Sequence, residues 1–235
     1  MKNLIIASTS TLHGGNYLDY LLSELKLLYS DADEILFIPY ARPGGISHEA
    51  YTERAAKVFK TLDKSVKGIH QFENAGVAVS KAQGIFIGGG NTFVLVNQLY
   101  RNQLIEPLQK RIESGTPYLG TSAGSNICGL TMSTTNDMPI VQPPSFKTLA
   151  SVPFNINPHY LDPDPNSKHM GETRETRIRE FHQFNTQPVV GLREGSFLRV
   201  RDGDIVLKGA LSARIFEYGK EPFELESGSS LKGLK

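Results

Sequence analysis

The chain has 235 residues, and its 25 lysines and arginines nearly balance 24 aspartates and glutamates, for a formal net charge of +1. This balance argues against a nucleic-acid-binding protein that depends on a basic face, because affinity for phosphate grows with the number of cations supplied. Hydrophobic residues make up 39% of the chain and charged residues 21%, which excludes the intrinsically disordered class.

A single cysteine, Cys128, excludes an intrachain disulfide and any zinc site built from several cysteines. The apolar run Leu4–Ala7 near the start is shorter than the roughly 7–15 residues of a secretory signal. No apolar run approaches the roughly 20 residues that cross a bilayer. We therefore expect a cytoplasmic protein with no membrane partner, no nucleic-acid partner, no metal and no cofactor.

Short apolar runs alternate with amphipathic stretches through the first two-thirds of the chain. The expected strands are Leu4–Ala7, Glu34–Tyr40, Val66–Phe72, Gly84–Ile87 and Thr116–Gly120. The expected helices are Asn16–Ser30, a helix that Ser47 caps and whose apolar face reaches Leu62, Thr92–Tyr100 and Leu104–Ser114. Strand, turn and helix repeated in this way indicate right-handed βαβ units, and so an α/β fold with a mostly parallel, doubly wound sheet.

The pattern changes after Pro188. The runs Val189–Leu192, Phe197–Arg201 and Ile205–Lys208 are short and lie between turns. Asp202-Gly203 between two apolar alternations predicts a hairpin, and so an antiparallel C-terminal extension at the edge of the sheet. Because no linker rich in Gly, Ser or Pro divides the chain, we expect a single domain over residues 1–235.

The segment Gly120-Thr121-Ser122-Ala123-Gly124 matches G-x-S-x-G, the pattern of a nucleophile elbow between a strand and a helix. Glycines are needed there because the backbone of a tight, strained turn approaches its neighbours too closely for Cβ atoms. The serine hydroxyl would then project from the sheet edge, with the Ala123 N–H pointing to where an oxyanion forms. The alternative is an ordinary glycine-rich turn.

A serine nucleophile needs a base and a group that orients the base. His159 is the first candidate for the base, because the alternating strand Phe154–Pro158 delivers it to a strand end; His13, in the first loop, is a weaker candidate. For the orienting carboxylate we expect Asp137, which gives the chain order Ser, Asp, His, and keep Glu194 as the alternative third member.

Two further segments could contribute to a site. Gly88-Gly89-Gly90-Asn91 lacks the spacing of a dinucleotide or P-loop motif, so we favour Gly89 or Gly90 as a second oxyanion donor over a phosphate site or a plain turn. We also expect Asn91 to contact the substrate. Arg174 opens a helix, where a cation is unfavourable; it could hold a carboxylate, although the residues alone favour a solvated arginine.

Five segments in this order closely resemble peptidase E, the α-aspartyl dipeptidase family, from the first strand to Glu194-Gly195. They are Gly88-Gly89-Gly90-Asn91-Thr92-Phe93, Ser122-Ala123-Gly124, Thr134-Thr135-Asn136-Asp137-Met138-Pro139-Ile140-Val141, Ile156-Asn157-Pro158-His159 and Gly171-Glu172-Thr173-Arg174-Glu175. The resemblance implies a fold like that of class I glutamine amidotransferases, with serine in place of cysteine at the elbow. It also implies a serine-type dipeptidase whose partner is a small peptide with an N-terminal aspartate.

Carried over to this chain, the resemblance makes Ser122 the nucleophile and His159 the base. Asp137 and Glu194 both match family segments, so the third member stays open. Arg174 matches the arginine expected to hold the aspartyl side chain of the substrate. One departure is Thr121, where the family often carries an aromatic residue.

Related cyanophycinases share the elbow and the glycine loop, so a cyanophycinase, an isoaspartyl-type peptidase or an esterase remains an alternative. A non-catalytic module that binds a ligand through its glycine loop is a second alternative.

Overall fold

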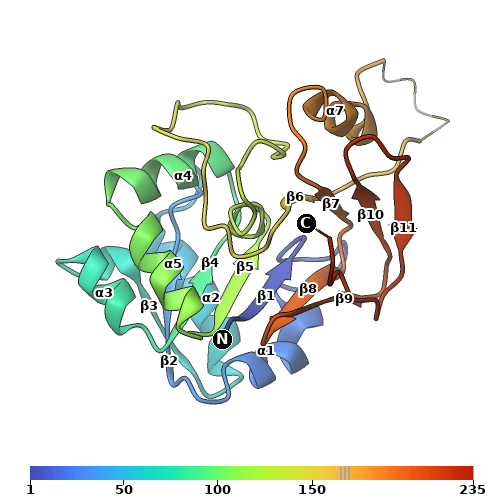
Figure 1. The fold of residues 1–235 in the computed structure, drawn as a ribbon. Coiled ribbons are helices and arrows are strands. Elements are labelled where there is room, and N and C mark those ends of the chain that lie inside the picture. The colour runs from blue at the N-terminus through green and yellow to red at the C-terminus, as the bar shows by residue number, and fades with distance from the viewer. Residues whose placement is uncertain (165, 167, 169, 235) are drawn as a thin grey trace.

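The structure, a computed structural model, describes residues 1–164, 166, 168 and 170–234. Its larger sheet has seven strands in the order β3-β2-β4-β5-β1-β8-β9 (Figure 1). These strands are β1 (Asn3–Ala7), β2 (Glu34–Ile38), β3 (Ser65–Gly68), β4 (Gly84–Ile87), β5 (Tyr118–Thr121), β8 (Ser196–Arg201) and β9 (Asp204–Gly209). The first five strands in this order are parallel, and β8 and β9 add antiparallel pairs at one edge.

The fold prediction is confirmed: the fold is α/β, with a mainly parallel sheet and antiparallel strands toward the C-terminus. Hairpin β8–β9 turns at Asp202 and Gly203, which have φ angles of 53° and 89°. Because a two-residue turn of this kind needs positive φ at both positions, Asp-Gly was a reliable signal for it.

A second, four-stranded sheet was not anticipated from the sequence. Its order is β11-β10-β7-β6, with β6 (Asn155–Pro158), β7 (Val189–Leu192), β10 (Ala213–Phe216) and β11 (Phe223–Leu225). Strand β7, expected at the edge of the main sheet, instead pairs in parallel with β6 and antiparallel with β10. Periodicity identifies a strand but not its partners, so the sequence pattern could not distinguish one sheet from two.

Helices cover both faces of the main sheet. They are α1 (Leu22–Leu28), α2 (His48–Lys60), α3 (Ala75–Lys81), α4 (Thr92–Arg101), α5 (Ile105–Glu113), α6 (Ala123–Asn126) and α7 (Arg174–Phe181). Alternate residues of a strand point to opposite faces. Accordingly, Leu4 and Ile6 of β1 join the core under α3, α4 and α5, whereas Ile5 and Ala7 join the core under α1 and α2. Helix α7 packs on the second sheet through Ile178.

Two predicted elements are shorter than expected. The helix expected over Asn16–Ser30 begins late, because Leu18 has a left-handed φ of 62° and a 3₁₀ turn, Asp19–Leu21, precedes α1. The third strand ends at Gly68, where the Gln71 side chain accepts a hydrogen bond from the Gly68 N–H and closes a 3₁₀ turn. In contrast, the Ser47 cap is found as expected, since its hydroxyl accepts from the Ala50 N–H.

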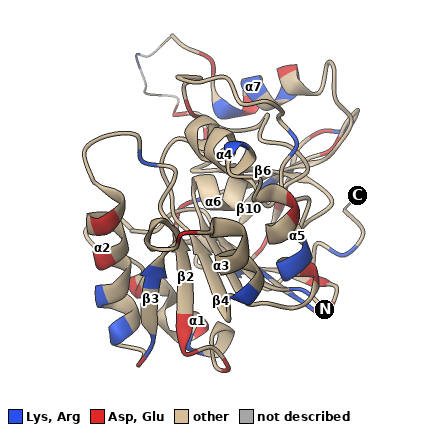
Figure 2. Ribbon diagram, turned by 90° about the vertical axis from the view of Figure 1, so that its left-hand side faces the viewer, with Lys and Arg blue, Asp and Glu red and all other residues tan. Residues whose placement is uncertain are grey.

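Charges of both signs are interspersed along α2, α5 and α7 (Figure 2). Among the helices that the structure describes, none is long and apolar enough to span a bilayer.

Cys128 lies in the main core with no solvent exposure, and burial raises the pKa of its thiol to about 12. Since the thiolate is the reactive form, we expect no reaction of the folded protein with a thiol reagent such as DTNB near pH 8. One equivalent should react once the chain is unfolded in guanidinium chloride. Rapid labelling of the folded protein would contradict this placement.

Candidate active site

Ser122 follows β5 in a strained turn, with φ 55° and ψ −111°. Backbone outside the favoured regions costs about 1–3 kcal/mol and persists only where the surroundings enforce it. Here the flanking glycines let neighbouring backbone pack closely enough to hold Ser122 at these angles. A Cβ on Gly120 would lie 2.3 Å from the Gly124 carbonyl oxygen, and a Cβ on Gly124 would lie 2.2 Å from the Ile87 carbonyl oxygen. The bend therefore has the geometry expected of a nucleophile elbow.

His159 lies against the serine. Its Nε2 is 2.8 Å from Ser122 Oγ, and its Nδ1 is 2.6 Å from a carboxylate oxygen of Glu194. A carboxylate only accepts hydrogen bonds, so it favours the tautomer with the proton on Nδ1 and leaves Nε2 free to accept from the serine hydroxyl. The side chains of His159 and Glu194 are 35% and 45% exposed, so the constellation is open to a substrate.

Three strand ends bring these residues together. Ser122 follows β5 of the main sheet, whereas His159 and Glu194 follow the parallel strands β6 and β7 of the second sheet (Figure 1). The carboxyl ends of strands in open α/β sheets are the usual position of a functional site.

Ser8, at the end of β1, joins the two sheets. Its hydroxyl donates to the Leu192 carbonyl oxygen at 2.6 Å and accepts from the His159 backbone N–H at 2.9 Å. Ser8 is completely buried. It was not among the candidates, although its position directly after the first apolar strand is the signal that could have found it.

Glu194 is positioned by its neighbour. Arg193 pairs with Asp162 and Glu224 at 2.6 and 2.8 Å and donates to Ser212, and these bonds hold the pKa of the Arg193 guanidinium above its usual range. The residue that precedes Glu194 is thus tied to strand β11 through Glu224 and to the loop after β6 through Asp162.

Asp137, the first expectation for the group that orients His159, forms its hydrogen bonds with other residues. Its carboxylate accepts from the Thr92 N–H at 2.7 Å and from the Thr135 hydroxyl at 3.0 Å, at the beginning of α4. The Nδ1 of His159 is instead bonded to Glu194. Asn136, one residue earlier, donates to the Pro158 carbonyl oxygen beside His159. Sequence order could not separate the two carboxylates, because both follow short runs whose spatial neighbours are set by tertiary packing.

Of the expected oxyanion donors, Ala123 follows Ser122 directly and Gly89 packs against it. A Cβ on Gly89 would lie 2.8 Å from Ser122 Cβ, which places the glycine loop against the nucleophile. Gly90 has φ 145° and packs on Ala41, where a Cβ would lie 2.2 Å from the carbonyl oxygen. Within the described part of the chain, the N–H groups of Gly89, Gly90 and Ala123 have no protein acceptor. They are therefore available to an external oxygen.

Asn91 and Arg174, the expected substrate contacts, differ in the bonds that they form within the protein. The Asn91 amide caps α4 by accepting from Val94 and donates to the Met138 carbonyl oxygen. Arg174 is partly buried at the beginning of α7 and forms no ion pair with any residue that the structure describes. Its pKa is lowered mainly by burial and then by Arg177, whereas the negative charge of Asp137 acts in the opposite direction. The remaining candidate, His13, is exposed on its loop.

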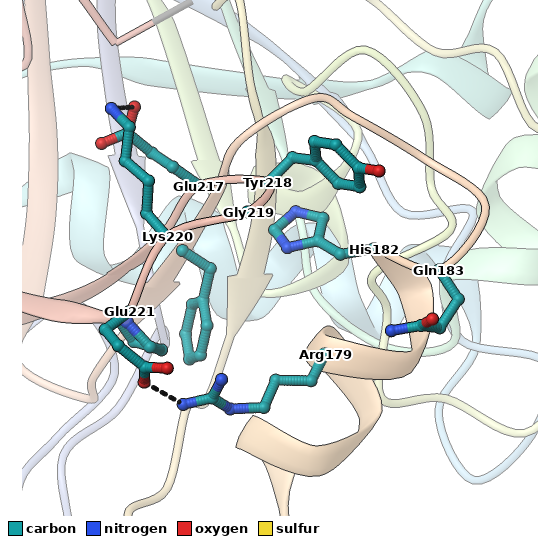
Figure 3. Close-up of a pocket in the computed structure, with 10 residues that line it drawn as sticks. Arg179, His182, Gln183, Glu217, Tyr218, Gly219, Lys220 and Glu221 are labelled. Atoms are coloured by element: carbon teal, nitrogen blue, oxygen red, sulfur yellow. Dashed lines mark hydrogen bonds and ion pairs between the residues drawn. The ribbon is translucent and has the colours of Figure 1, made fainter.

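A separate hollow lies between α7 and the turn after β10 (Figure 3). Its charged residues are already paired, Arg179 with Glu221 at 2.8 Å and Lys220 with Glu217 at 2.9 Å. None of the predicted site residues lines it. In the residues placed by the structure, no three His, Cys, Asp or Glu side chains are grouped to hold a metal ion.

Comparison with known proteins identifies relatives that match the chain over almost its whole length. Peptidase E of Streptomyces coelicolor is 47% identical over 232 residues, which cover 99% of this chain and 94% of the relative. A probable alpha-aspartyl dipeptidase of Drosophila melanogaster is 43% identical over 92% of this chain and 90% of its own.

Two solved structures share the fold. A putative peptidase E protein from Listeria monocytogenes has a TM-score of 0.68 and 21% identity, over 90% of this chain and 100% of its own. A peptidase from an acI-B1 actinobacterium has a TM-score of 0.73 and 17% identity, over 99% and 97%. At these identities the structures support the fold alone. The model of peptidase family S51 matches residues 4–208, which, with the relatives above, confirms the resemblance. The chain therefore belongs to peptidase family S51.

Proposed function

We propose that this chain is a serine-type α-aspartyl dipeptidase, which hydrolyses dipeptides with an N-terminal aspartate. The observation that carries the proposal is the line of hydrogen bonds from a strained serine through His159 to Glu194. The membership of family S51 and a relative named for α-aspartyl dipeptidase activity support the choice of substrate. A reducing cytoplasm suits the lone, buried Cys128, and we propose that the enzyme works there.

In the first half of the reaction, Ser122 Oγ attacks the aspartyl carbonyl carbon while His159 Nε2 takes the hydroxyl proton. The carbonyl oxygen becomes an oxyanion and accepts hydrogen bonds from Ala123 and from the glycine loop. Each such donor is worth about 3–4 kcal/mol in other serine hydrolases. The tetrahedral intermediate then collapses: the peptide C–N bond breaks, and His159 returns its proton to the leaving amine.

In the second half, water attacks the ester on Ser122 as His159 again takes a proton. Collapse releases free aspartate and restores the serine hydroxyl. Glu194 stabilises the imidazolium that forms in each half, and the second-sheet contacts of Arg193 keep it in place. The role of orienting carboxylate therefore goes to Glu194 rather than to Asp137.

Specificity rests on Arg174. Burial penalises its charge, and no described residue neutralises it, so an incoming aspartyl carboxylate would offset that cost. An asparagine or leucine substrate offers no anion. It would leave the partly buried guanidinium without a counter-charge, so that its transition state is bound less well than that of an aspartyl substrate.

Replacement of the nucleophile, Ser122→Ala, should abolish turnover of Asp-X dipeptides and labelling by a fluorophosphonate probe, with the thermal unfolding midpoint retained. Ser125→Ala is the matched control. Its hydroxyl is buried and lies 2.6 and 2.7 Å from the carbonyl oxygens of Ala7 and Gly120, to either of which it can donate, so the variant should lose stability yet still be labelled. Undiminished hydrolysis by Ser122→Ala would show that Ser122 is not the nucleophile.

Glu194→Gln should lower kcat for Asp-X by up to about 10⁴-fold with little change in KM, because the amide lacks the charge that supports the imidazolium and that favours the tautomer with the proton on Nδ1. Steady-state kinetics on the purified variant test this. A KM effect without a kcat effect would place Glu194 in substrate binding instead.

Arg174→Met should lower kcat/KM for Asp-X by about 100-fold and leave Asn-X and Leu-X almost unaffected, so that the preference for aspartate is lost. Arg177→Met, in the same helix and more exposed, is the control and should keep the preference. An unchanged preference in Arg174→Met would contradict the assignment. A panel of α-Asp, β-Asp and ester substrates on the wild type separates this function from the isoaspartyl, cyanophycinase and esterase alternatives.

A further inference from the structure

Arg42 lies against the glycine loop and has no part in the proposed mechanism. It follows β2, the strand that pairs with β4, and its Nε donates to the Gly89 carbonyl oxygen at 3.1 Å. The Tyr51 hydroxyl donates to the same oxygen at 3.2 Å, and the guanidinium carbon of Arg42 lies 5.5 Å from the centre of the Tyr51 ring. One hydrogen bond and one aromatic ring therefore hold this cation beside the loop.

The positive charge of Arg42 is not neutralised by the protein. The side chain forms no ion pair with any residue that the structure describes, and its Nη1 and Nη2 donate to none of them. A second guanidinium, that of Arg54, lies 4.6 Å from the centre of the Tyr17 ring. Burial raises the pKa of Tyr17 and the charges of Arg54 and Arg42 oppose that rise, so both cations lie near its hydroxyl.

The Tyr17 hydroxyl is itself buried and has no hydrogen-bond partner among the described residues. This side of the glycine loop thus combines two positive charges with donors that the protein does not use. Such a combination suits an anionic group, because hydrogen bonds between a guanidinium and a carboxylate are among the strongest in proteins.

Arg42 and Arg174 lie on opposite faces of the main sheet. Tyr51, the ring under Arg42, belongs to the core beneath α1 and α2. Arg174 is influenced by the charge of Asp137, which bonds to the beginning of α4, and α4 packs on the other face. Ser122 follows a strand of the sheet itself, so it lies between the two cations. A peptide bound across the strand ends would therefore have a guanidinium on each side.

The distances fit a dipeptide. A Cβ on Gly89 would lie 3.3 Å from Ser122 Oγ, so bond lengths through the Gly89 carbonyl group place Arg42 Nε at most about 10 Å from that hydroxyl. In a dipeptide the C-terminal carboxylate carbon is at most about 4 Å from the scissile carbonyl carbon. With an attack distance of about 3.5 Å and an ion pair of about 2.8 Å, a cation that binds this carboxylate lies within about 11 Å of Ser122 Oγ. The position of Arg42 is compatible with that limit.

We propose that Arg42 binds the C-terminal carboxylate of the dipeptide, and so recognises the residue that leaves. This inference rests on the proposed function. Arg174 holds the first residue through its side chain and Arg42 holds the second through its terminus, so that the scissile bond lies over Ser122. One more residue at the C-terminus moves the carboxylate about 3.5 Å farther away, so the site favours dipeptides over longer peptides.

The competing explanation is that Arg42 only supports the glycine loop through the Gly89 carbonyl oxygen. Two substrates separate these roles, the dipeptide Asp-Leu and its C-terminal amide, which differ only in the terminal carboxylate. Loss of support for the loop would impair the hydrolysis of both, because the same oxyanion forms in each reaction. Loss of a partner for the carboxylate would impair the hydrolysis of Asp-Leu alone.

The wild type should prefer Asp-Leu to its amide by about 10-fold in kcat/KM, with the released aspartate measured by chromatography. In Arg42→Met the preference should disappear, through a loss of about the same factor on Asp-Leu and almost none on the amide. Arg42→Lys keeps the charge but not the two-pronged geometry, and should retain part of the preference. Retained hydrolysis of the amide also shows that Arg42→Met is folded.

Lys57→Met is the control, because it removes an exposed cation of α2 and should leave both rates unchanged. Equal rates on the two substrates in the wild type, or an equal loss on both in Arg42→Met, would overturn the inference and leave the proposed function standing. A wild type that hydrolyses neither substrate would contradict the proposed function itself, and the inference with it.

Discussion

The site depends on one buried hydroxyl, that of Ser8, which joins the two sheets. Ser122 follows a strand of the larger sheet, whereas His159 and Glu194 follow strands of the smaller one. By donating to Leu192 and accepting from His159, Ser8 sets where the second sheet docks on the end of β1. Buried polar groups are costly when unpaired, so both of these bonds must be satisfied together. That requirement favours the single docking geometry in which Nε2 meets Ser122 Oγ.

Strain at the nucleophile is the second requirement. Ser122 adopts backbone angles that cost free energy. These angles persist because Gly120 and Gly124 pack against neighbouring backbone and leave no room for a relaxed turn. The same packing brings the glycine loop against the serine and leaves its N–H groups without protein partners. The strained turn, the position of Ser122 and the nearby glycine loop are therefore consequences of one compact arrangement at the ends of β4 and β5.

The segment from Thr134 to Asp137 links the two halves of the site. Asn136 donates to Pro158, the last residue of β6 and the one before His159, whereas Asp137 accepts from the beginning of α4 beside the glycine loop. A carboxylate in such a segment resembles a triad member when only its position in the chain is considered. In space its carboxylate is hydrogen-bonded to Thr92 and Thr135, whereas the Nδ1 of His159 is bonded to Glu194.

Local physics in the sequence was sufficient for much of this protein. Apolar runs of four or five residues, Ser47 as a cap, Asp202-Gly203 as a hairpin and the glycine frame around Ser122 all act over a few residues, so their patterns are readable in one dimension. The partner strands of β7, the identity of the orienting carboxylate and the role of Ser8 were not readable in that way. Each depends on contacts between residues more than twenty positions apart, such as Leu192 with Ala213, His159 with Glu194 and Ser8 with Leu192. Only the packing of the two sheets decides those contacts, because a local pattern specifies which side chains a strand presents but not which strand end they meet.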